Sequence, residues 1–135
     1  MSNFSAYVEQ SIYDWMVLNT AMPATTANIY LGLSTADPVD DASGLAEPVG
    51  GGYAREIAAF GARGSVNGTG TSGSNSGIIT FTTATGSWGA ITHGALFDAI
   101  SGGNMLAFWQ WTVPKTIGVG DTFIVAIGDL ELLIR

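Results

Sequence analysis

The stretch of sequence that decides the fold runs from Trp88-Gly-Ala-Ile-Thr-His-Gly-Ala-Leu-Phe-Asp98, through Ala-Ile-Ser-Gly-Gly103, to Asn104-Met-Leu-Ala-Phe-Trp-Gln-Trp-Thr112. The segments Trp88–Asp98 and Asn104–Thr112 are apolar runs of the length and composition that form β-strands. Gly102-Gly103 lies between them and is a hairpin signal, although the loop is longer than a two-residue turn. We therefore predict two antiparallel strands joined by a loop.

Both sides of the second strand are apolar. Trp109 and Trp111 fall on one side, and Leu106 and Phe108 fall on the other. A strand that is apolar on both sides is either central in a two-layer core or covered by another subunit. Core packing is the favoured interpretation, and a subunit interface is the alternative.

Further short runs of β-type sequence surround this hairpin, separated by turn signals about every ten residues. No segment of this region resembles a crossover helix, which disfavours a parallel α/β sheet. We predict a mainly β fold, an antiparallel β-sandwich that is jelly-roll-like, as a single domain over residues 23–135. The other expected strands are Asn28–Ser34, Tyr53–Phe60, Ile78–Thr83, Lys115–Val119, Phe123–Ile127 and Leu130–Ile134.

The N-terminal segment, residues 1–22, has the one helical pattern in the chain. We expect an amphipathic helix over Asn3–Thr20, capped by Ser2 or Asn3 and ended ahead of Pro23. Packing on the body of its own subunit is the favoured arrangement, and reaching over a neighbour is the alternative. Apolar residues recur at three- and four-residue steps and share one face of this helix: Phe4, Val8, Ile12, Trp15 and Leu18.

The composition points toward a protein whose work is contact. Charged residues make up 11% of the 135 residues and hydrophobic ones 47%. Either this is a robust β-protein with a Thr/Ser surface, or other subunits cover part of the surface; we predict a homo-oligomer, a trimer or a dimer. The net charge of −7 argues against nucleic acid as a partner. No apolar run is long enough to span a membrane, and no signal peptide is recognisable.

Residues suited to catalysis are scarce, so we expect no enzyme and no cofactor. His93 is the one histidine and has no evident nucleophile and carboxylate beside it in the pattern. Asp37, Asp40, Asp41 and Glu47 lie in an acidic loop whose spacing does not match an EF-hand. A solvated loop is favoured there, and a bound divalent cation is the alternative.

The polar run Arg63–Ile78 is rich in Gly, Ser, Thr and Asn, and long loops are usually functional or disordered. We expect it to lie against a neighbouring subunit, and to be replaceable by a tight turn over Gly68–Ser76 without loss of the fold. A mobile solvent loop is the alternative. The interface candidates come from this run, the N-terminal helix and the aromatic strand: Phe4, Tyr7, Trp15, Asn67, Thr69, Thr71, Ser74, Asn75, Trp109 and Trp111.

The order of segments resembles a family of small tailed-phage virion proteins, described as tail-fibre or capsid-decoration proteins. The resemblance covers nearly the whole chain, and its pieces occur in the same order. After the N-terminal helix, the pieces that carry it are Ile29-Tyr-Leu-Gly-Leu-Ser-Thr-Ala-Asp-Pro38, Gly50-Gly-Gly-Tyr-Ala-Arg55, Ile79-Thr-Phe-Thr-Thr-Ala-Thr-Gly-Ser-Trp-Gly89, Ile91-Thr-His93, Leu96-Phe-Asp-Ala99, Gly102-Gly-Asn104, Lys115-Thr116, Val119-Gly-Asp-Thr122 and Gly128-Asp-Leu130.

The resemblance implies a virion structural protein, assembled in the cytoplasm of the bacterial host. The first hypothesis is a capsid decoration (cement) protein on the outer capsid surface, with the major capsid protein as partner. The alternative is a tail-fibre or baseplate component that contacts the tail or the host surface. Against a fibre shaft, the chain lacks coiled-coil heptads and fibrous repeats. A third hypothesis, a carbohydrate-binding sandwich, is disfavoured because the tryptophans cluster in strands and charge is low.

Overall fold

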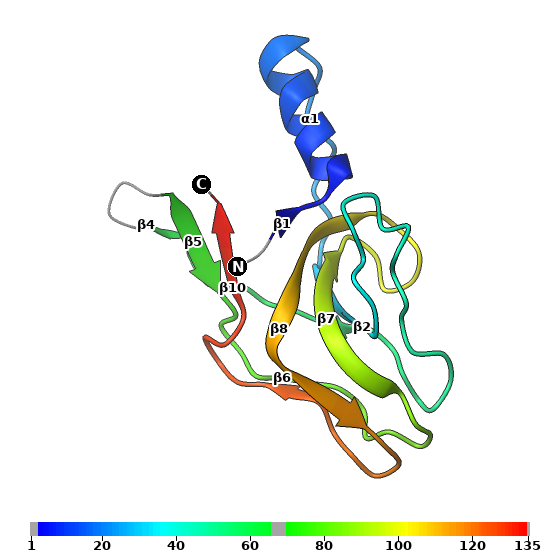
Figure 1. Cartoon of the computed structure of the whole chain (residues 1–135). Coiled ribbons are helices and arrows are strands. Elements are labelled where there is room, and N and C mark those ends of the chain that lie inside the picture. The colour runs from blue at the N-terminus through cyan, green and yellow to red at the C-terminus, as the bar shows by residue number, and fades with distance from the viewer. Residues whose placement is uncertain (1–2, 66–69, 135) are drawn as a thin grey trace.

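The computed structural model describes residues 3–65 and 70–134. Antiparallel strands form three sheets, and one helix, α1 (Ala6–Val17), projects from the body near the N-terminus (Figure 1). The largest sheet has the order β1-β8-β7-β2-β3, and the smaller ones are β10-β5-β4 and β6-β9. The strands are β1 (Asn3–Phe4), β2 (Tyr30–Ser34), β3 (Glu56–Ile57), β4 (Gly64–Ser65), β5 (Thr71–Ser74), β6 (Ile79–Thr80), β7 (Gly89–Phe97), β8 (Met105–Ile117), β9 (Ile124–Val125) and β10 (Glu131–Ile134).

The predicted hairpin forms the centre of the fold as β7 and β8. Their antiparallel ladder extends from Phe97↔Met105 to Gly89↔Ile117, and β2 pairs with the other side of β7. β8 continues past the expected end at Thr112 and includes most of the segment expected as a separate strand at Lys115–Val119. A bulge in β8 makes this possible, because it takes up the extra residues before pairing with β7 resumes.

The larger of two hydrophobic clusters lies between the five-stranded sheet and the smaller sheets folded over one of its faces. Leu31, Leu33 and Ile91 of the large sheet are fully buried in one cluster with residues from β6, β9 and their flanks. Aromatic rings dominate this layer, with Phe81 packing edge-on against Phe123 at a centroid distance of 5.7 Å. The prediction of a mainly antiparallel β fold with one N-terminal helix is thus confirmed.

Glycine permits two close approaches that this core requires. Gly94 of β7 lies beneath the indole of Trp109, where an added Cβ would be 2.6 Å from the ring atom Cζ2. Gly51 has φ of 60° and accepts a hydrogen bond of 2.9 Å on its carbonyl oxygen from the indole N–H of Trp88. Only glycine adopts such a φ readily and leaves room for the ring.

The N-terminus differs from the expected helix at both ends. Asn3 and Phe4 form β1, and the helix cap is Ser5, whose hydroxyl accepts from the backbone N–H of Val8. The helix ends at Val17, well ahead of Pro23, because Asn19 turns left-handed with φ of 55° and Thr20 N–H bonds back to the carbonyl of Asp14. The cap prediction of Ser2 or Asn3 is therefore wrong.

The polar run is partly strand, where the sequence suggested a loop. β4 and β5 lie within it, and β5 pairs over its whole length with β10, from Thr71↔Ile134 to Ser74↔Glu131. Backbone hydrogen bonds carry this pairing, so small polar side chains suffice. Conversely, the expected strand Tyr53–Phe60 is mostly irregular, with only Glu56–Ile57 paired as β3 and an isolated bridge from Phe60 to Asn75.

Candidate interaction surface

Helix α1 presents an unusual amount of apolar surface. None of its residues is buried, and beyond its base it stands clear of the sheets (Figure 1). Trp15 is 56% exposed and Met16 70% exposed, and Tyr13, Val17 and Leu18 are also exposed. At 100° per residue these side chains surround the helix, so its outer half is apolar on nearly all sides. A helix end of this kind is normally buried in an assembly.

The base of α1 is fixed firmly to the body. Ser5 N–H donates to the carbonyl of Leu106 at 3.1 Å, and its hydroxyl donates to the carbonyl of Met105. Ala6 N–H donates to the carbonyl of Asp40 at 2.9 Å. The expectation that the helix packs along its own subunit thus holds only for this base, where Val8 and Ile12 are half-buried.

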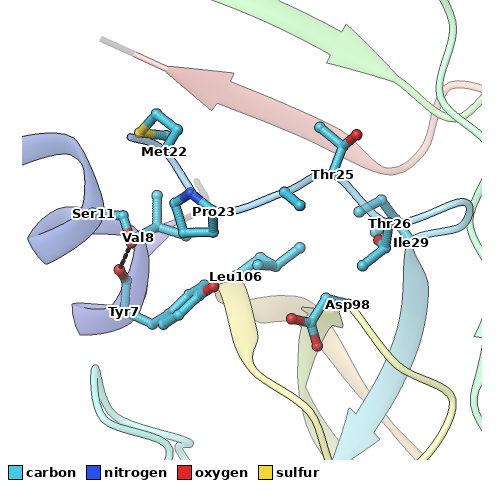
Figure 2. Close-up of a pocket in the computed structure, with 11 residues that line it drawn as sticks. Tyr7, Val8, Ser11, Met22, Pro23, Thr25, Thr26, Ile29, Asp98 and Leu106 are labelled. Carbon is cyan, nitrogen blue, oxygen red and sulfur yellow. Dashed lines mark hydrogen bonds between the residues drawn. The ribbon is translucent and has the colours of Figure 1, made fainter. Parts of the chain in front are cut away.

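A cavity of about 400 Å³ opens beside the base of the helix (Figure 2). Tyr7, Val8 and Ser11 line it from α1, and Leu106 lines it from β8. The returning segment from Met22 to Thr26 forms the facing wall, and Asp98 is the only charged residue among the described residues that line the cavity. Both Asp98 carboxylate oxygens already accept hydrogen bonds from Asn104. The cavity is therefore an apolar extension of the exposed helix surface.

The structure brings only some of the predicted interface residues together. Phe4, Tyr7 and Trp15 lie on β1 and α1 at this surface, with Phe4 and Tyr7 half-buried. Thr71 and Ser74 lie in β5, on the small sheet. Asn67 and Thr69 fall outside the described residues.

Two of the predicted aromatic interface residues lie in the core. Trp109 is 7% exposed, and Trp111 is half-buried against the core cluster. Their rings meet edge-on at a centroid distance of 5.4 Å. Neither indole N–H has a hydrogen-bond acceptor among the described residues. For Trp109, the structure of the single chain thus agrees with core packing, which was the favoured interpretation of this strand.

Asn75, another interface candidate, is internal. It is 1% exposed, and its amide N–H₂ donates to the carbonyls of Gly77 at 2.8 Å and Ala126 at 2.9 Å. Its amide oxygen accepts from Leu130 N–H at 3.0 Å. The side chain joins the end of β5 to the start of β10, so its contacts are within the chain.

Sequence reasoning missed a buried ion pair. Arg55, 6% exposed, donates to both Glu47 carboxylate oxygens at 2.9 and 2.7 Å and to the carbonyls of Ala99 and Gly102 at 2.8 Å. Its guanidinium carbon lies 3.4 Å from the centroid of the Phe97 ring. The arrangement ties the acidic loop to the β7–β8 loop.

Tyr53 completes this cluster. Its hydroxyl donates to Glu47 at 2.8 Å and accepts from Leu33 N–H at 2.9 Å, and burial raises the pKa of Tyr53 above its ordinary value. Four segments that carry the family resemblance meet here: Ile29–Pro38, Gly50–Arg55, Leu96–Ala99 and Gly102–Asn104. Their common presence in the family pattern was the sequence signal that could have indicated a shared structural role for these segments.

The acidic loop and His93 show local hydrogen bonding. Asp37 and Asp41 accept hydrogen bonds from the backbone N–H groups of Val39 and Ser43, and bonding from Ser43 lowers the pKa of Asp41. Residues 3–65 and 70–134 contain no group of three or more His, Cys, Asp or Glu placed to hold a metal ion. The His93 ring nitrogen Nδ1 lies 2.8 Å from the Thr92 hydroxyl.

The fold and this surface define a small antiparallel β module with an exposed apolar helix at one end. Residues 3–133 match the model of the family described as "Podophage GP4 fiber I protein gp80", and the chain belongs to that family. It is thus a structural protein of the tailed-phage virion, in agreement with the resemblance seen in the sequence. No curated protein matches the chain. Within the part of the chain that the structure describes, no helix is long and apolar enough to cross a membrane.

Proposed function

We propose that this virion protein is a component of the phage fibre and assembles as a small homo-oligomer through the outer half of α1. The match over residues 3–133 carries the proposal, because the family description names a fibre protein. That description supports the tail-fibre hypothesis better than the capsid-decoration hypothesis, which it does not mention.

The shape of the chain suits an attachment or end module of a fibre better than its shaft. The twelve residues of α1 span about 18 Å, and the strands form short sheets rather than a repeated, rod-like stack. Length in a fibre would therefore come from other chains, to which this module is joined.

The outer half of α1 fits burial among copies of the same helix. Only Glu9 and Asp14 are charged among its twelve residues, so close approach of several copies brings few like charges together. The exposed apolar side chains surround the helix, and packing against more than one neighbour would cover them. Closed cyclic assembly is the common way for identical chains to do this.

Light scattering on the purified protein tests the assembly. We expect a mass that is a multiple of 13.9 kDa, and we expect Trp15→Ser/Met16→Ser to reduce it to that of one chain. Val119→Ser, at an exposed turn far along the sequence from α1, is the matched control and should leave the mass unchanged. A wild-type protein that stays at 13.9 kDa at high concentration would contradict the oligomer.

Gold-labelled antibody on intact phage tests the location independently of the oligomer. Label on the tail or its fibres is the expected result. Label spread evenly over the capsid would instead favour decoration of the major capsid protein.

A further inference from the structure

The outer edge of β8 is paired for only part of its length. β7 pairs with one edge, and β1 pairs with the other at Ala107 and Phe108. Beyond Phe108, no strand in residues 3–65 or 70–134 pairs with this outer edge. Alternate residues of an antiparallel strand turn their N–H and C=O groups to each side, so this edge offers unused donors and acceptors.

The bulge in β8 frees more backbone beside this edge. Pairing with β7 jumps from His93↔Gln110 to Ile91↔Lys115, so four residues of β8, at 111–114, face the single residue Thr92. The ladder with β7 thus skips this stretch. Bulges are common next to functional sites, where they change the direction of a side chain or end the pairing of a strand.

A groove of about 390 Å³ runs along the edge. Trp109, Gln110, Trp111 and Thr112 line it from β8, and Asp129, Leu130, Glu131 and Leu133 line the facing wall. The β8 residues are consecutive, whereas the face of a strand would contribute alternate residues. The groove therefore follows the edge of β8, while β10 itself contributes the alternate residues Glu131 and Leu133. In Figure 1, β10 lies beside β8 on the side away from β7.

Trp109 and Trp111 both line this groove, but their rings lean over Gly94 of β7, away from the outer edge of β8. A Cβ at Gly94 would lie 2.8 Å from Cε2 of Trp109 and 2.9 Å from Cζ2 of Trp111. The two side chains therefore contribute apolar surface to the groove, and the unpaired donors and acceptors are those of the β8 backbone.

Charge indicates which kind of polypeptide fits. Asp129 and Glu131 are exposed on the facing wall, and none of the described residues that line the groove is basic. A second copy of this chain is poorly suited, because it carries a net charge of −7 and has only four basic residues, of which Arg55 is buried. Charge complementarity favours a different protein with lysine or arginine in the docking segment.

We propose that the β8 edge from Trp109 to Thr112 receives an extended, lysine- or arginine-bearing segment of another virion protein, as a strand added in line with β1. β1 already shows that this edge accepts a strand, at Ala107 and Phe108. Pro114 lacks an N–H and limits the added strand to the stretch before it. The proposal requires only that the protein is in the virion, so it is independent of the fibre function and of the α1 oligomer.

Photo-crosslinking in assembled phage tests the occupant. Benzoylphenylalanine at the exposed position Gln110 should crosslink to a peptide of another virion protein that contains lysine or arginine. The same probe at the exposed turn residue Val119 is the control and should give no such product. A crosslink from position 110 to a second copy of this chain, or none in particles that contain the protein, would overturn the proposal.

Charge reversal provides a second test. Glu131→Lys should lower incorporation into particles by at least about fivefold, since a rim charge then repels the basic segment. Asp40→Lys is the matched control, because the Asp40 side chain is exposed and its helix contact is made through the backbone. If both variants fold by circular dichroism and incorporate equally, the charge argument for the occupant is wrong.

Discussion

Replacing Arg55 by Met should destabilise the chain more than any surface change, because Arg55 holds two loops together through one side chain. The variant keeps a similar volume but removes the ion pair with Glu47 and the donors to Ala99 and Gly102. Removing one partner of a buried pair costs about 3–5 kcal/mol. The Glu47 side chain is 21% exposed and can be partly rehydrated, so we expect the lower end, about 3 kcal/mol.

Urea unfolding followed by tryptophan fluorescence measures this loss, and the melting temperature should fall by about 10 °C. Arg63→Met, at an exposed arginine, is the matched control and should change stability by less than about 0.5 kcal/mol. The double variant Glu47→Gln/Arg55→Met should lose less than the sum of the two single changes. A loss below about 1 kcal/mol for Arg55→Met would refute the reasoning, since it would mean that the pair contributes no more than a surface one.

Three further predictions follow from buried groups and from the polar run. Burial raises the pKa of Tyr53, so the neutral phenol contributes its full stabilisation below the unfolded pKa of about 10, and this contribution is lost as the pH rises above that value. Between pH 8 and 11, the urea midpoint of Tyr53→Phe should therefore fall less steeply with pH than the midpoint of the wild-type protein. Asn75→Ala leaves the partners of three hydrogen bonds unsatisfied and should cost about 2–3 kcal/mol in the same assay, whereas a loss near zero would show that water replaces them. Shortening Gly68–Ser76 to an Asn-Gly turn removes β5, so circular dichroism should show loss of strand signal, contrary to the expectation from sequence; an unchanged spectrum would contradict the β5–β10 pairing.

Periodicity was enough to predict the elements that depend on local pattern. The helix near the N-terminus and the β7–β8 hairpin follow from apolar spacing and from Gly102-Gly103, which act within a few residues. The ends of α1 were harder to predict. Several polar residues near each end can cap or terminate a helix, and only the backbone geometry shows that Ser5 is the cap and that Asn19 adopts the left-handed conformation.

The features that shape the surfaces depend on distant contacts. Arg55 reaches carbonyl groups more than forty positions away, and β5 pairs with a strand near the other end of the chain. Nothing in the alternation of β8 reveals the bulge at 111–114, which is visible only against its partner β7. For the candidate site, the sequence singled out Tyr7 and Trp15 but placed the apolar helix face mainly against its own subunit.

The copy number of the protein in purified phage tests the central claim most directly. Quantitative mass spectrometry can count it against the major capsid protein with isotope-labelled peptides from both. A fibre component attached as a small closed oligomer should be present in a few to a few dozen copies per particle. Hundreds of copies, in fixed proportion to the major capsid protein, would contradict the fibre proposal and favour a decoration protein.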